Sequence, residues 1–341
     1  MAQEDFGIVV GINDYQDPTY GRLDGACRDA EDFAAWLKSP DGGNVPKENV
    51  NPFTKLSDAG GNEPMLSHLL ILLQNMRKRA AAGKKRVGRR LYIFLAGHGI
   101  SPPELDEAGL LTVEAGDSVT PYLPGKQSAD QFCLSARFEE VVLFMDCCRV
   151  TDLLLQRFTL PISEKPDPAA AGKIRRFYAF ATALGKTARE TDNAGVVRGV
   201  FSRVLLEGLN GAVLPDETGR MSTTQVRTYL EAELRKIKIN GEEQTPHFPC
   251  KDEIVLAEGL TPRRLGVTLT YRQPAPSIAV LDGGNNLAPV TPENFTVISG
   301  GSRFLLPPGK TYVIQALDAT GVATRMISLK LDAADVDDAI L

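Results

Sequence analysis

Hydrophobic residues gather in four predominantly apolar runs within the first 183 positions of the chain. Most of these runs end at glycine or at polar residues. Apolar runs without alternation suit the central strands of a mostly parallel sheet that is covered on both faces. The predicted strands span residues 6–14, 89–99, 140–148 and 175–183.

Apolar residues at spacings of three and four predict helices between and after these runs. Asp24 and Ser222 stand where N-caps of two of these helices are expected, and Gly208 lies near the end of a third. Strands therefore alternate with helices to about residue 255, which is the pattern of an α/β sandwich. The predicted helices span residues 24–38, 63–82, 199–213 and 222–237.

The pattern changes after residues 259–264, where only short alternating segments remain, separated by Pro, Gly and Asn. Such segments predict a small all-β domain with a sandwich-like arrangement. We therefore divide the chain into an α/β domain, residues 1–258, and an accessory β domain, residues 259–341. The predicted strands of the second domain span residues 265–272, 277–282, 294–299, 312–318 and 324–331.

The composition narrows the function classes. Of 341 residues, 43% are hydrophobic and 24% are charged, which is typical of a soluble globular protein. The net charge of −5 argues against a nucleic-acid partner. No apolar run reaches the roughly 20 residues of a membrane span, and no secretory signal is recognisable. The five cysteines match no zinc or disulfide framework, so we expect free thiols in a reducing cytoplasm.

Two of the predicted strands end at residues that are capable of catalysis. His98 lies in "FLAGHG", and Cys147 and Cys148 lie in "MDCC". Because the carboxyl ends of neighbouring parallel strands meet at one edge of a sheet, we expect these side chains to lie close together. A cysteine at a strand end is often no more than buried packing. Its pairing with a glycine-flanked histidine favours an imidazole-assisted thiol nucleophile instead.

The chain resembles the caspase-like cysteine peptidases, and most closely the metacaspases and bacterial caspase homologues. The resemblance rests on "GIVVGINDY", "LDGACRDAEDFAAWL", "FLAGHG", "LFMDCC", "ATALGKTARE", "GVFSRVLLEGL" and "EQTPHF", in that order across residues 6–248. Cys148 follows His98 by 50 positions, an interval that is typical of caspases. The resemblance implies that Cys148 is the nucleophile, that His98 is its base, and that the backbone of Gly99 and Cys148 forms the oxyanion hole.

The resemblance also implies a specificity. In metacaspases two acids hold a basic P1 side chain, and the matching residues here are Asp29 and Asp146, which predicts cleavage after Arg or Lys. The chain departs from the usual Asp-Ser-Cys motif because Cys147 replaces the serine, which leaves a vicinal-thiol role open. Val150 and Thr151 also break the usual continuation of the motif.

Regulation is a further implication of the resemblance, since bacterial relatives are often effectors in defence or cell death. Self-processing is expected at Lys173, Arg175 or Arg176, with residues 83–90 as a second basic segment. An upstream activating protease or another regulator is an equal alternative. We expect a monomer with protein or peptide substrates and neither a nucleic-acid nor a membrane partner.

Several residues have simpler interpretations. His68, His247 and the cysteines other than Cys148 are expected to be structural, and Asp29 is by pattern alone equally a solvated helix residue. No cofactor or metal is required. Ca²⁺ is a minor alternative, because Asp14, Asp17 and Asp24 cluster without an EF-hand spacing. The alternative function is a catalytically weak scaffold that binds a partner through the β domain.

Overall fold

The chain forms two compact units in a computed structural model. The first comprises residues 1–210 and 222–257, and the second comprises residues 211–221 and 258–341. The sequence pattern did not reveal that residues 211–221 group with the C-terminal unit. The structure describes residues 2–53, 74, 86–101, 107–116, 120–151, 155–157, 166–193, 195–239, 241–261, 264–273, 277–307, 310–331 and 335–341.

A six-stranded sheet forms the centre of the first unit, in the order β16-β10-β7-β3-β1-β2. All neighbouring pairs are parallel except β10 with β16. The four predicted strands correspond to β1, β3, β7 and β10, and the edge strands β2 and β16 were not predicted. The bounds are β1 Asp5–Gly11, β2 Val50–Phe53, β3 Arg90–Ala96, β7 Glu140–Asp146, β10 Arg175–Phe180 and β16 His247–Lys251.

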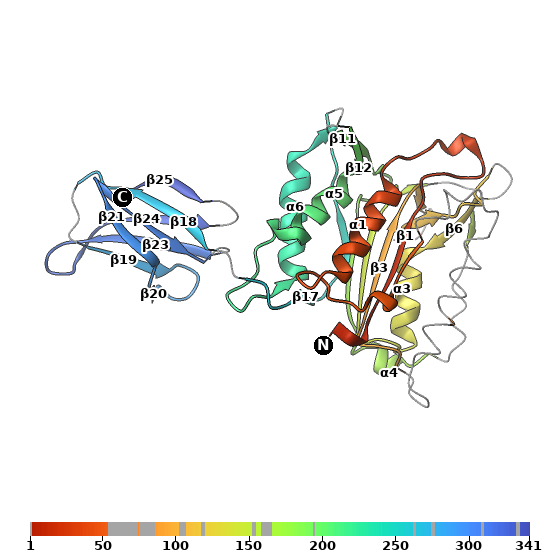
Figure 1. The fold of residues 1–341 in the computed structure, drawn as a ribbon, viewed down its shortest axis with the longest axis horizontal. Coiled ribbons are helices and arrows are strands. Elements are labelled where there is room, and N and C mark those ends of the chain that lie inside the picture. Colours follow the sequence, from red (N-terminus) through yellow and green to blue (C-terminus); the bar gives the residue numbers. More distant parts are fainter. Residues whose placement is uncertain are drawn as a thin grey trace. The chain divides into compact units, whose positions relative to one another are not determined.

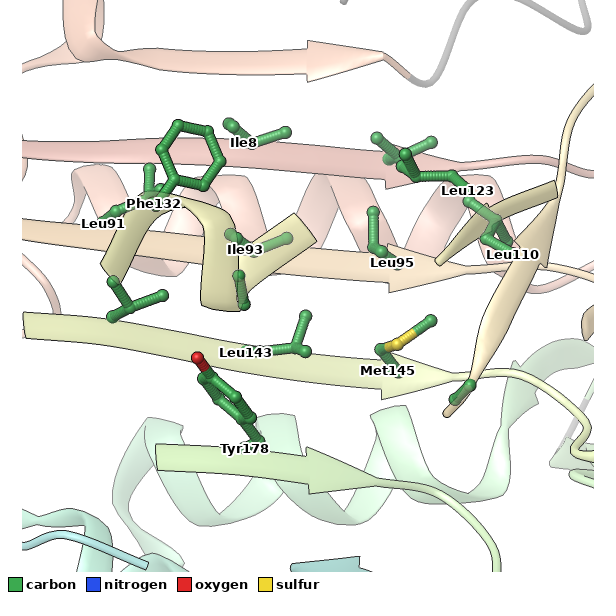
Figure 2. Packing of buried hydrophobic residues seen from close by; sticks show 14 of the residues in the cluster. Ile8, Leu91, Ile93, Leu95, Leu110, Leu123, Phe132, Leu143, Met145 and Tyr178 are labelled. Atoms are coloured by element: carbon green, nitrogen blue, oxygen red, sulfur yellow. The ribbon is translucent and has the colours of Figure 1, made fainter. Parts of the chain in front are cut away.

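Helices cover both faces of this sheet, which explains why its strands are continuously apolar (Figure 1). On one face, Phe33 of α1 (Ala26–Lys38) stacks on Phe94 of β3 at 4.7 Å between ring centroids. On the other, Ile93 and Leu143 belong to one buried cluster with Phe132 of α3 (Gly125–Leu134), part of which is drawn in Figure 2. The predicted α/β class with a mostly parallel sheet is confirmed.

A row of alternating charges crosses the sheet at the first residue of four strands. Asp5, Arg90, Glu140 and Arg175 are direct neighbours in the strand register. Arg90 Nε lies 2.5 Å from a Glu140 carboxylate oxygen, and Arg175 pairs with the other oxygen of that carboxylate. Asp5, Arg90 and Glu140 are buried. Because a buried charge without a partner is costly, these pairings favour the observed register.

A smaller five-stranded sheet, in the order β8-β4-β5-β6-β9, begins directly after the two candidate catalytic motifs. β4 follows His98, β8 follows Cys148 and Arg149, and these two strands pair in parallel, with Ile100 opposite Val150. This pairing holds the chain after each motif at a fixed separation. The bounds are β4 Gly99–Ser101, β5 Gly109–Leu111, β6 Thr120–Pro124, β8 Val150–Thr151 and β9 Leu155–Arg157.

The hairpin of β11 (Glu190–Asn193) and β12 (Val196–Gly199) leads directly into α5 (Val200–Glu207) and lies beside α1 (Figure 1). α5 ends at Glu207 with Gly208 as its C-cap, and a π-helical turn, Gly208–Ala212, covers most of the rest of the predicted helix 199–213. α6 (Thr223–Lys236) begins at the predicted cap Ser222, which forms a capping box with Gln225.

Two predictions about helices need comment. The N-cap of α1 is Gly25 and not Asp24. The Glu190 carboxylate accepts the backbone N–H groups of both residues, so a side chain from β11 takes the place of a local capping side chain. The predicted helix 63–82 lies outside the described residues, except for Gln74, which is helical. The remaining elements of the first unit are η1 Ala2–Glu4, η2 Pro18–Tyr20, η3 Lys47–Asn49, α4 Pro168–Ala171, β14 Lys238–Ile239, β15 Glu242–Glu243 and β17 Val255–Ala257. β17 pairs with β13, Met221–Ser222.

The C-terminal unit contains two four-stranded sheets, β21-β22-β18-β25 and β20-β19-β23-β24, around one core that includes Leu265, Phe304 and Ile314. The predicted all-β class of this region is confirmed, although β20, β22 and β25 were not predicted. Across the described ranges, no helix combines the length and apolarity of a membrane span. The bounds are β18 Leu265–Thr270, β19 Ser277–Asp282, β20 Ala288–Val290, β21 Glu293–Ile298, β22 Gly301–Leu306, β23 Lys310–Leu317, β24 Ala323–Leu331 and β25 Val336–Ile340.

Candidate active site

One pocket of the first unit contains both His98 and Cys148. It has a volume of about 160 Å³ and lies at the carboxyl ends of β3 and β7, where ligands of parallel sheets gather. Three carboxylates line the same pocket: Asp29, Asp146 and Glu190. The structure thus brings together the thiol, the imidazole and both acids that the sequence singled out, and it adds a third acid.

Two tyrosines and a carbonyl group position His98. Its backbone N–H donates to the hydroxyl oxygen of Tyr15 at 2.7 Å, and its ring lies 5.1 Å from the Tyr15 ring and 6.3 Å from the Tyr20 ring. The ring atom Nε2 lies 3.0 Å from the carbonyl oxygen of Gly21. The loop after β1 therefore supplies all of these contacts to His98.

The contact with Gly21 fixes the tautomer of His98. A carbonyl oxygen only accepts hydrogen bonds, so Nε2 must carry the proton. In the neutral imidazole, Nδ1 is then the unprotonated nitrogen and the one that can accept a proton from a nucleophile. The neutral ring is thus prepared to act as a base through Nδ1.

Cys148 is in a resting state in this structure. Its thiol donates to the carbonyl oxygen of Ala188, with 3.6 Å between sulfur and oxygen. Burial raises the pKa of the Cys148 thiol above its ordinary value. The sulfur is consequently protonated at neutral pH, and a base must remove its proton before it can attack.

Glycine is required at two positions beside His98 for different reasons. A Cβ atom on Gly99 would lie 2.5 Å from Cys147 Cβ, so this glycine permits close packing against the strand that carries the thiols. Gly97 lines the pocket with φ of 152°, a conformation that other residues rarely adopt.

Asp29 comes from α1 and is almost completely buried, with 1% of its surface exposed. Arg198 donates to its Oδ1 at 3.0 Å, and the backbone N–H of Gly199 donates to its Oδ2 at 2.8 Å. Burial, followed by the charge of Asp146, raises the pKa of Asp29 to about 7 despite these donors. Asp29 is therefore a paired residue of the pocket wall rather than a solvated helix residue.

Asp146 is the last residue of β7 and accepts hydrogen bonds at the start of α5. The backbone N–H and the hydroxyl of Ser202 both donate to its Oδ2, at 2.9 and 2.7 Å. Burial raises the pKa of Asp146 to about 6, although the Ser202 donors oppose this. Its other oxygen, Oδ1, has no hydrogen-bond partner among the residues that the structure describes.

Glu190 is the pocket residue that the sequence did not predict. It begins β11, and its two carboxylate oxygens accept the backbone N–H groups of Asp24 and Gly25, at 3.1 and 2.8 Å. These donors lie at the start of α1, where a negative charge is favourable. Only its position in the "ATALGKTARE" motif hinted at a role, and no local pattern distinguishes it from a solvated residue.

The other candidate residues lie apart from this chemistry. Cys147 is 2% exposed and belongs to the buried cluster that contains Phe132 of α3. Burial raises the pKa of its thiol well above the ordinary value. His247 lies in β16 against Phe180, at 6.0 Å between ring centroids, and His68 is outside the described residues.

The acidic residues of the loop after β1 have local partners. Asp14 pairs with Arg22 at 3.6 Å, and Asp17 accepts from Thr19. Within the described ranges, no group of three potential ligands is arranged to hold a metal ion.

The candidate processing residues differ in their surroundings. Arg175 and Arg176 belong to β10, which is hydrogen-bonded to β7 and β16, and Arg176 N–H also donates to Asp252 at 2.7 Å. A protease requires an extended segment that is free of other pairing, so these bonds are protected while the sheet is intact. Lys173 is exposed in a turn before the strand.

The comparisons with known proteins find proteases. No family model matches the chain. A probable protease from a Desulfuromonadales bacterium is 28% identical over 220 residues, which cover 61% of this chain and 26% of the relative. The chain thus spans about a quarter of the length of that relative.

Two solved structures of caspases are similar to part of this chain. The crystal structure of caspase-1 from Spodoptera frugiperda has a TM-score of 0.49 and 14% identity, and the match covers 75% of this chain and 91% of that chain. A structure of pro-Sf-caspase-1 has a TM-score of 0.42 and 15% identity, over 75% and 90% of the two chains.

Proposed function

We propose that the protein is a cysteine endopeptidase that cleaves after Arg or Lys. The observation that supports this most strongly is the shared pocket, in which a thiol and an oriented imidazole lie beside three carboxylates. The resemblance of the motifs to caspase-like peptidases and the similarity to a probable protease point to the same reaction.

The proposed reaction begins with transfer of the Cys148 proton to Nδ1 of His98. The thiolate attacks the carbonyl carbon of the scissile peptide bond, and the oxyanion is stabilised by N–H donors, which we assign to Gly99 and Cys148. The C–N bond then breaks as His98 returns the proton to the leaving amine. Water, activated by the same imidazole, hydrolyses the thioester and restores the thiol.

The carboxylates support a basic P1 residue. The pocket lining contains three acids against one guanidinium group, that of Arg189, so a cationic side chain is attracted and an acidic one is repelled. Burial raises the pKa values of Asp29 and Asp146, and the charges of Asp146 and Glu190 respectively add to this, so both acids would be stabilised by a further positive charge. A guanidinium group or ammonium group at P1 would supply it.

A set of peptides that differ only at P1 tests this proposal. We expect turnover with Arg and Lys, and little or none with citrulline or Asp, where citrulline keeps the shape of arginine without its charge. Cys148→Ala should abolish all turnover. Cleavage restricted to Asp, or equal cleavage after Arg and citrulline, would refute the proposed specificity.

The resting thiol is what a regulated protease would show, and it also supports the alternative of a catalytically weak scaffold. An arginyl chloromethylketone separates the two, because it alkylates an active cysteine at a pocket that accepts arginine. Labelling that is lost in Cys148→Ala supports the peptidase. If the protein never reacts with the probe, even with added regulators, the scaffold is the better description.

Self-processing is a separate proposal. Among the three predicted residues, Lys173 is the one outside the sheet, so we expect a first cut after Lys173. Mass spectrometry of the wild type after incubation, beside Cys148→Ala and Lys173→Gln, would identify it. An unchanged fragment pattern in Lys173→Gln would exclude that site.

A further inference from the structure

The two acids assigned to the P1 pocket are not equivalent. Both oxygens of Asp29 are occupied, one by Arg198 and one by the N–H of Gly199. Asp146 uses only Oδ2, for both donors of Ser202. Of these four oxygens, Oδ1 of Asp146 is the one without a hydrogen-bond partner among the described residues.

Arg198 is an internal guanidinium group placed against the wall of the pocket. It is the penultimate residue of β12, and it bridges two carboxylates of α1, with Nη1 on Asp29 and Nη2 on Asp32. Its side chain is 21% exposed, whereas that of Asp29 is 1% exposed. It lines a neighbouring groove rather than the pocket itself, so a substrate would meet Asp29 from the opposite side.

We propose that Arg198 is a specificity-determining residue that serves as the built-in counter-charge of Asp29, so that the P1 cation is received by Asp146. This inference rests on the proposed cleavage after basic residues. A buried carboxylate without a counter-charge takes up a proton readily, and the charge and hydrogen bond of Arg198 oppose this at Asp29. The pocket can then remain anionic at neutral pH although two of its acids are close neighbours.

The charges around Asp29 define what removal of Arg198 would do. Arg198 from β12 and Asp146 from β7 face it directly, and Asp32 acts through Arg198. Arg189 and Glu190 lie in the same pocket lining.

Without Arg198, only the N–H of Gly199 would oppose burial and the repulsion by Asp146. An opposite charge at this range lowers the pKa of a carboxyl by about 1–3 units, so its loss should raise the pKa of Asp29 by a similar amount.

The test measures binding rather than turnover, so that His98 and Cys148 do not contribute to the pH profile. Cys148→Ala protein is titrated with two peptides that differ only in P1 arginine or P1 citrulline, from about pH 5 to pH 9. The dissociation constant of the citrulline peptide divided by that of the arginine peptide should rise with pH as the pocket acids ionise. In Arg198→Met, the midpoint of this rise should move to higher pH by about 1–3 units.

Arg203→Met is the matched control. Arg203 lies in α5, lines the same groove, has a similarly exposed side chain at 26%, and pairs with Glu207 instead of a pocket acid. It should leave the midpoint unchanged. Arg198→Lys keeps the positive charge, so its midpoint should stay within half a pH unit of the parent midpoint. Comparison of the lysine and methionine variants therefore separates loss of the charge from loss of the fold.

The outcomes are distinct. If Arg198→Met and Arg203→Met show the same midpoint as the parent, the role of Arg198 is refuted while the basic specificity stands. If the parent does not distinguish arginine from citrulline at any pH, the proposed specificity fails, and this inference fails with it. Asp146→Asn should remove more of the arginine preference at pH 8 than Asp29→Asn, and the reverse order would overturn the assignment of Asp146.

Discussion

Substitution of Asp146 by asparagine should make the folded protein more stable and less specific. Asparagine has the same shape, and its Oδ1 can accept both hydrogen bonds of Ser202. The substitution removes a carboxylate whose pKa in the folded protein is about 6, against an ordinary value of 3.8. It therefore separates the two roles of this residue, as the cap of α5 and as an acid of the pocket.

The sign and size follow from proton linkage. Because the pKa of Asp146 is raised by folding, the folded protein binds more protons than the unfolded chain between about pH 4 and pH 6. Its stability consequently falls as pH rises through that window and stays lower above it. A difference of roughly two pKa units corresponds to about 3 kcal/mol. Asp146→Asn should recover this amount at pH 7.5 and almost none at pH 4.

Urea unfolding of the wild type and Asp146→Asn across pH 4–8, followed by tryptophan fluorescence, measures the difference. Trp36 packs on Phe33 of the first unit, which makes the signal specific for that unit. The gain should appear between pH 4 and pH 6 and extend toward pH 7, because the charge of Asp146 also raises the pKa of Asp29. If the variant is equally destabilised at every pH, the carboxylate is only a helix cap and the reasoning is wrong.

Three further substitutions test the supports of the site. Tyr15→Phe removes the acceptor of the His98 N–H and should cost about 1–3 kcal/mol in urea unfolding, with a roughly tenfold lower kcat; an unchanged kcat would contradict the role of the hydroxyl. Gly199→Ala would place a methyl group against a pocket carboxylate and should raise KM for arginine peptides in steady-state assays, whereas an unchanged KM would show that the pocket adapts. Glu140→Gln leaves the buried Arg90 with less counter-charge and should destabilise by about 3–5 kcal/mol without altering P1 preference, and a loss below 1 kcal/mol would show that the charge row contributes little.

The candidate nucleophile and base could be predicted because strand ends are visible in the sequence. The apolar runs that became β3 and β7 stop shortly before His98 and Cys148, and parallel strands bring such ends together regardless of loop details. The positions of strand ends are properties of the sheet, and the sheet is determined by continuous apolar segments. The assignment of Asp146 to the pocket came instead from the resemblance to metacaspases.

The supports of the site could not be predicted because they depend on contacts between distant loops. Arg198 and Asp29 are separated by 169 positions, and Glu190 and Gly25 by 165. Each pair forms only after the hairpin β11–β12 has packed against α1, and neither leaves a periodic pattern. The smaller sheet was missed for a related reason, since its strands have two to five residues and little room for alternation.

A single segment, residues 188–202, connects the nucleophile to the acids of the pocket. Its first residue, Ala188, accepts the Cys148 thiol, and its last, Ser202, donates to Asp146. Between them, Glu190 holds the start of α1. Because these contacts lie on one stretch of backbone, a movement that frees the thiol from Ala188 also changes the donors of the pocket acids. We therefore expect that a ligand which releases the Cys148 thiol from Ala188 also alters the binding of a cation at the pocket acids, and the reverse.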